Sequence, residues 1–161
     1  MKRYVVAIIM AWIVFIGIDF LFHAGIFASM WKEDIAVFKS TKDLTSLIPI
    51  GYISFLLLTM LIGYLFLKIF KIKPPIIDAF KFGLIFGILF SLSNFLGLFS
   101  YIAIPLKQLF FVNLVYFIEI IFVTLSLYFT FFAINLKRVI WCTILCFILL
   151  LLSGILIQNI L

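Results

Sequence analysis

Charged side chains are scarce in this sequence. Asp, Glu, Lys and Arg together make up 11% of its 161 residues, with six acidic residues and one histidine, whereas hydrophobic residues make up 68%. A chain with so little polar surface cannot cover a soluble globule. The sequence therefore predicts an all-α integral membrane protein, with residues 1–161 forming a single transmembrane domain and no soluble domain.

The motifs of familiar enzyme classes are also missing. The sequence has no Gly-rich phosphate loop, no Gly-x-Ser-x-Gly elbow, no His-Glu-x-x-His and no Cys-x-x-Cys motif. Its two cysteines, Cys142 and Cys146, are one helical turn apart, a spacing that suits a disulfide poorly. We expect no catalytic residue and no cofactor, and a membrane enzyme stays open only as a lesser alternative.

Five apolar runs are long enough to span a bilayer, which takes about 20 residues. They cover residues 5–29, 46–68, 77–100, 110–134 and 139–160. Pro74 and Pro75 cannot continue the second run as a helix, and Pro49 falls in its first turn, where a missing N–H costs little. Cleavage of the first run as a signal peptide would leave four spans, but the run is long enough to span. We predict a polytopic bundle of five transmembrane helices.

Lysine and arginine positions predict the orientation. With the N-terminus in the cytoplasm, eight of the twelve basic residues fall on the cytoplasmic side: Lys2, Arg3, Lys68, Lys71, Lys73, Lys81, Lys137 and Arg138. The positive-inside rule then predicts a cytoplasmic N-terminus and, with five spans, an external C-terminus. We expect this multi-pass protein to be integral to the cell (inner) membrane. Because the basic residues lie in short gaps between apolar runs, the net charge of +6 indicates topology, and we expect no nucleic acid partner.

A few polar residues interrupt the predicted spans. Asp19 and Glu119 lie about ten residues from the external ends of the first and fourth helices, which puts them at one depth. His23, Asn94, Asn113 and Tyr116 lie nearer the external face. An aspartate near the centre of a membrane helix costs roughly 2.5 to 3.5 kcal/mol, so these side chains are expected to face the bundle interior.

The third span carries a stripe of small residues. Ala79, Gly83, Gly87 and Ser91 repeat every four residues, a pattern that lets a neighbouring helix approach closely. On a regular helix, Asn94 lies only about 20° from Gly83. We therefore expect the Asn94 amide to lie in a helix interface.

These residues support two classes of function. In the first, Asp19, His23, Asn94, Asn113, Tyr116 and Glu119 form a polar pocket that binds or translocates a small solute, an ion or a proton. In the second, they only lock helix packing in an accessory or structural membrane protein. Asp19, His23 and Glu119 are also metal-ligand types, but three such residues at a common spacing are weak grounds for a metal, and we assign none. The expected partners are the lipid bilayer and a small solute or ion, with the oligomeric state left open.

Parts of the sequence are similar to a family of small bacterial membrane proteins classed as a domain of unknown function. The similarity rests on Ile18-Asp19 in an apolar first helix that begins Met1-Lys2-Arg3-Tyr4, and on Gly83-x-x-x-Gly87 followed by Asn94. Members often carry a Tyr-Asp pair before a Thr-Asn pair in the third helix, where this chain reads Ser91-Leu92-Ser93-Asn94. The fifth helix is additional. The resemblance implies a compact helical bundle and brings no assigned activity.

Overall fold

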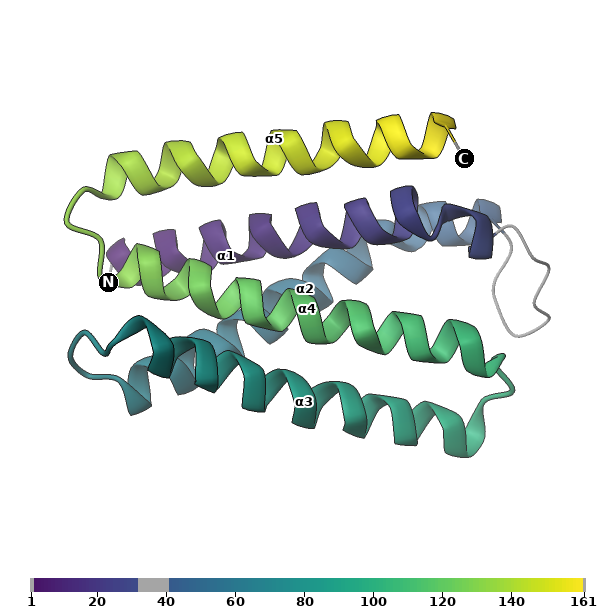
Figure 1. Ribbon diagram of the computed structural model, residues 1–161, viewed down its shortest axis with the longest axis horizontal. Helices are drawn as coiled ribbons and strands as arrows, with labels where there is room; N and C mark the ends of the chain where they lie inside the picture. Colours follow the sequence, from purple (N-terminus) through teal and green to yellow (C-terminus); the bar gives the residue numbers. More distant parts are fainter. Residues whose placement is uncertain (1, 32–40, 161) are drawn as a thin grey trace.

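The computed structural model describes residues 2–31 and 41–160 of the chain, and the regular structure in them is helical throughout. Seven helical segments follow one another: α1 (Lys2–Phe20), η1 (Leu21–Ile26), η2 (Ala28–Trp31), α2 (Thr41–Ile69), α3 (Ile76–Tyr101), α4 (Leu106–Phe131) and α5 (Leu136–Ile160) (Figure 1). η1 is a π-helix and η2 a 3₁₀-helix, whereas the five long segments are α-helices. The predicted all-α fold is confirmed.

Five helices are long and apolar enough to cross a membrane. They cover Lys2–Ile26, Ser46–Ile69, Ile76–Tyr101, Leu106–Phe131 and Leu136–Ile160. Each lies within a few residues of a predicted span, and the fourth is displaced most, beginning four residues earlier than the expected start at residue 110. The chain is therefore a multi-pass membrane protein by the length and composition of its helices.

Prolines and one asparagine set several helix ends. Pro75 and Pro105 precede the first residues of α3 and α4 with extended backbone angles. The Asn135 side chain accepts a hydrogen bond from the Arg138 N–H at 3.1 Å and so caps α5. The prediction for Pro49 was wrong, because α2 begins at Thr41 and Pro49 lies two turns inside it. The polar residues before the apolar run continue the helix and place this proline beyond its first turn.

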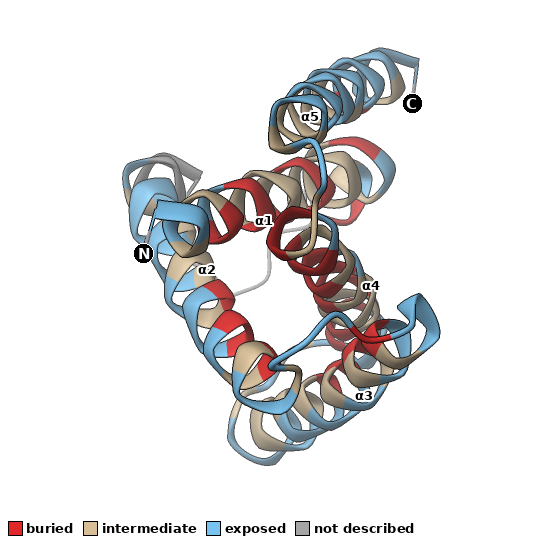
Figure 2. Cartoon of the chain, turned by 90° about the vertical axis from the view of Figure 1, so that its left-hand side faces the viewer, coloured by how far each residue is buried: buried red, intermediate tan, exposed pale blue. Residues whose placement is uncertain are grey.

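Four helices surround the interior and the fifth lies outside them. In the end-on view, α1, α2, α3 and α4 form the sides of a bundle, and α5 packs on the outer face of α1 (Figure 2). α2 runs diagonally, from the end of α1 to the beginning of α3 (Figure 1). At its C-terminal end it meets α3 through ring contacts of Phe66 and Phe70 with Phe82.

The small-residue stripe of α3 is buried as expected. Ala79, Gly83, Gly87 and Ser91 are the buried residues of this helix. A Cβ added at Gly83 would lie 3.1 Å from Cβ of Thr124, and one added at Gly87 would lie 3.2 Å from a backbone oxygen of α4. Because Gly83 and Gly87 carry no side chain, α3 and α4 approach closely along this stripe.

A second close approach holds α5 against the first span. A Cβ added at Gly25, in η1, would lie 3.0 Å from the Cα of Gly154. Gly154 is also the buried residue of α5, whose other residues are exposed or only partly covered. α5 is thus positioned by a glycine–glycine contact and leaves most of its surface to the membrane.

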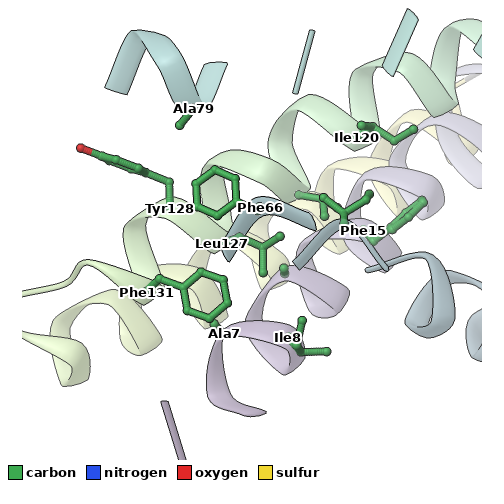
Figure 3. Close-up of a cluster of buried hydrophobic side chains, with 12 residues drawn as sticks. Ala7, Ile8, Phe15, Phe66, Ala79, Ile120, Leu127, Tyr128 and Phe131 are labelled. Atoms are coloured by element: carbon green, nitrogen blue, oxygen red, sulfur yellow. The ribbon is translucent and has the colours of Figure 1, made fainter. Parts of the chain in front are cut away.

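The hydrophobic core fills the half of the bundle that contains the N-terminus. Phe66, Leu127 and Phe131 lie at its centre, with Ala7 and Ile8 of α1 beside them (Figure 3). The rings of Phe66 and Phe131 stack with their centroids 6.3 Å apart. Phe15 and Ile120 also belong to this core, and Tyr116, one of the polar residues singled out from the sequence, packs against it.

Candidate functional site

Asp19 and His23 contact each other at the end of the first span. The distance between His23 Nε2 and Asp19 Oδ1 is 3.5 Å, and the side chains are 26% and 20% exposed, respectively. Asp19 belongs to the last turn of α1 and His23 to the π-helix that follows. π-Helical turns inside longer helices occur frequently at functional sites. The pair combines an acid and a base that are partly accessible from outside the bundle.

This pair lines a hollow between α1 and α2. The hollow has a volume of about 360 Å³. Its walls are Asp19, Phe20, His23 and Ala24 on one side and Ile48, Gly51, Tyr52 and Phe55 on the other. Among the described residues, no atom lies within 4 Å of the position that a Cβ would take at Gly51, so none of them covers this part of the wall. The hollow is large enough for a small ligand.

Two contacts fix α2 against α1 beside the hollow. The indole N–H of Trp12 donates to the backbone oxygen of Tyr52 at 2.8 Å. The rings of Phe15 and Phe55 stack with centroids 4.4 Å apart and nearly parallel planes. These contacts hold the Tyr52 and Phe55 rings in place relative to Asp19.

Glu119 lies within the bundle, on α4. Its exposed fraction is 0%, and neither carboxyl oxygen has a hydrogen-bond partner among the described residues. Electrostatic interactions connect Asp19 with Glu119 and with the hydroxyl of Tyr116. Burying a carboxyl group without a partner is costly, so this position is unusual for a residue that only supports packing.

Tyr116 lies between α2 and α3. Its ring contacts Phe55 of α2 edge-on at 6.4 Å and Phe90 of α3 edge-on at 5.7 Å, measured between ring centroids. Tyr116 therefore extends from α4 into the space between these helices, close to the wall of the hollow that Phe55 forms.

The two asparagines join α3 to α4. The Asn94 amide donates to Asn113 Oδ1 at 2.9 Å, and Asn113 Nδ2 donates to the Leu109 backbone oxygen at 2.7 Å. Asn94 lies in a helix interface as predicted. These hydrogen bonds occupy groups that a ligand would otherwise use.

The structure thus divides the six predicted site residues. Asp19 and His23 touch, Glu119 and Tyr116 lie within electrostatic range of Asp19, and the asparagines form a separate interhelical contact. Among the side chains that the structure describes, no three His, Cys, Asp or Glu residues converge as metal ligands would, and Asp19, His23 and Glu119 do not form such a group.

Sequence reasoning left out the α2 side of the hollow. None of Tyr52, Gly51 and Trp12 is among the site residues predicted from the sequence. The available signal was an aromatic residue next to glycine at the depth of His23, which becomes informative only once α2 is known to neighbour α1.

Comparison of the chain with protein-family models, with curated proteins and with solved structures finds no match, so the resemblance noted from the sequence stays a prediction and the function has to be argued from the geometry.

Proposed function

We propose that this protein, in the cell membrane, binds a small cationic solute or ion in the hollow between the outer halves of α1 and α2. The observation that carries the proposal is the contact of Asp19 with His23 at the mouth of that hollow. Ionisable residues at membrane depth commonly mark ion and substrate pathways. We further propose that the bound cation is translocated and that a proton competes with it for Asp19 and His23.

The chemistry of the walls favours a cation. Among the side chains that the structure describes, neither lysine nor arginine lines the hollow. Asp19 supplies carboxylate oxygens, and the rings of Tyr52 and Phe55 supply faces that attract positive charge. Behind this wall, the buried Glu119 adds a second carboxyl group that interacts electrostatically with Asp19.

Thermal unfolding of the purified protein in detergent tests this proposal. The probes are sodium, potassium, tetramethylammonium and ethanolamine, each titrated at fixed ionic strength. At a concentration 100 times its Kd, a bound cation stabilises the protein by about 2.7 kcal/mol. We expect at least one probe to raise the melting temperature of the wild type and to leave that of Asp19→Asn unchanged.

Asp78→Asn is the matched control. Asp78 lies at the other end of the molecule, where its carboxylate is 3.9 Å from Lys81 Nζ, so its removal leaves the hollow intact. The Asp78→Asn protein should keep the cation response of the wild type. Equal responses from wild type and Asp19→Asn, or no response to any probe, would rule the proposal out.

The alternative is an accessory protein whose polar residues only lock the helices. The hydrogen bond between Asn94 and Asn113 favours it, because that bond joins α3 to α4 and so gives these two side chains a role in helix packing. Failure of both Asp19→Asn and Glu119→Gln to fold in detergent would support this alternative over cation binding.

A further inference from the structure

Basic side chains gather at one end of the bundle. Eight of the twelve lysines and arginines lie there, at the start of α1, the end of α2, the start of α3, the loop between α2 and α3, and the start of α5: Lys2, Arg3, Lys68, Lys71, Lys73, Lys81, Lys137 and Arg138 (Figure 1). All eight are exposed. The acidic residue described at this end, Asp78, faces Lys81. The end therefore carries a strong positive charge.

A groove opens among these residues. It has a volume of about 400 Å³ and lies between the loop that joins α2 to α3 and the loop that joins α4 to α5. Lys73 is the charged member of its lining, and Ile76, Phe129, Ile134 and Val139 give it an apolar floor and sides. A groove of this kind presents one cationic side chain and an otherwise largely apolar surface to a ligand.

Local contacts hold the cations at the mouth. The Lys73 ammonium group lies over the ring of Tyr128, 6.0 Å from its centroid, and Tyr128 itself is buried. The Arg3 guanidinium donates to the backbone oxygen of Ala133, which also lines the groove. Arg138 lines a neighbouring hollow together with Phe129 and Cys142. Lys73 and Arg3, which come from different segments, therefore border one apolar groove.

We propose that this groove binds an anionic phospholipid, with the phosphate on Lys73 and one acyl chain along the apolar lining. Lysine binds phosphate as a point charge, and basic pockets between transmembrane helices bind anionic head groups. The apolar lining favours a lipid over free phosphate, since a free anion would gain nothing from Ile76 and Val139. The proposal is independent of the cation site in the other half of the molecule.

Lipid titration followed by native mass spectrometry tests it. The probes are dioleoylphosphatidylglycerol, dioleoylphosphatidylcholine with the same acyl chains, and inorganic phosphate. The wild type should bind the anionic lipid most tightly, and Lys73→Gln should weaken that binding about fivefold, the equivalent of about 1 kcal/mol, without affecting phosphatidylcholine. Val139→Trp, which fills the groove without changing the charge, should weaken binding of the anionic lipid as well.

Lys81→Gln is the matched control, because Lys81 is exposed at the same end and is absent from the groove lining. It should change the affinity less than twofold by this reasoning. Equal losses of lipid affinity in Lys73→Gln and Lys81→Gln would mean that the lipid is attracted by diffuse positive charge, and would overturn the proposed site. Inorganic phosphate competing as strongly as the lipid, or no preference for the anionic lipid, would overturn it too. If Lys73→Gln does not fold, two other variants test the proposal. Lys73→Arg should retain binding of the anionic lipid, and Val139→Trp should weaken it.

Discussion

At the scale of single residues, the polar side chains of the interior differ in whether they have partners. Asn94 and Asn113 satisfy each other across α3 and α4. Glu119, which is fully buried, has no hydrogen-bond partner on either carboxyl oxygen among the described residues. A satisfied amide pair adds to packing, whereas an unpartnered carboxyl costs free energy and calls for a role beyond packing.

The Asn94–Asn113 hydrogen bond should contribute little stability despite its geometry. A double-mutant cycle with Asn94→Ala, Asn113→Ala and the double variant should give a coupling energy of about 0.6 kcal/mol and no more than about 1.7, as is usual between membrane helices. The measurement is the free energy of unfolding in mixed detergent and SDS micelles. A coupling near zero would mean that the two amides do not interact in the folded protein.

Which side chains of α3 lie in a helix interface could largely be predicted from the sequence. The four-residue spacing from Ala79 to Ser91 fixes one face of a helix, so the burial of that face and the place of Asn94 in a helix interface followed from periodicity. The wall that Tyr52 adds beside Asp19 could not be predicted, because it depends on which helix neighbours α1. Hydropathy and depth carry no information about neighbours.

At the scale of elements, two glycines control how α5 packs. Gly25→Ala should destabilise the protein by about 1 to 3 kcal/mol, because the new Cβ would meet the backbone of Gly154 and push α5 away from η1. Gly97→Ala is the control, since nothing lies within 4 Å of its added Cβ, and it should be neutral or stabilising by up to about 1 kcal/mol. SDS titration of both variants measures the difference. Similar stability changes in the two would contradict the close contact.

The π-helix is an element that sequence periodicity could not predict. The prediction treated residues 5–29 as one span, and the structure ends the α-helix at Phe20 and continues with Leu21–Ile26 as a wider turn. The Phe27 N–H bonds to Phe22 O at 2.7 Å, a separation of five residues. The turn contains Gly25, which packs closely against Gly154 of α5, a contact that hydropathy does not reveal.

At the scale of the whole molecule, the basic end predicts the orientation in the membrane. Alkaline phosphatase, which is active only outside the cytoplasm, should be active when fused after Leu161 and silent when inserted in the loop of residues 70–75. The reason is the excess of lysine and arginine at the end that contains this loop. Activity in the loop fusion and silence in the C-terminal fusion would reverse the proposed topology.

The number and length of the spans were predictable because the bilayer fixes both. Each span needs about 20 apolar residues, and the runs that begin near residues 46 and 77 are separated by Pro74 and Pro75. The arrangement of the spans was not predictable. Nothing in the composition of α5 distinguishes it from the four bundle helices, yet Gly154 is its buried residue and it lies outside them.

The diagonal course of α2 brings one helix close to both proposed sites (Figure 1). Tyr52 lies beside the outer hollow and Phe66 in the core at the basic end, about 21 Å apart along the helix. The Phe66 ring contacts the ring of Phe132, which lines the lipid groove, with their centroids 6.4 Å apart. One helix therefore forms a wall of the hollow beside Asp19 and supports the lining of the groove with its last turns.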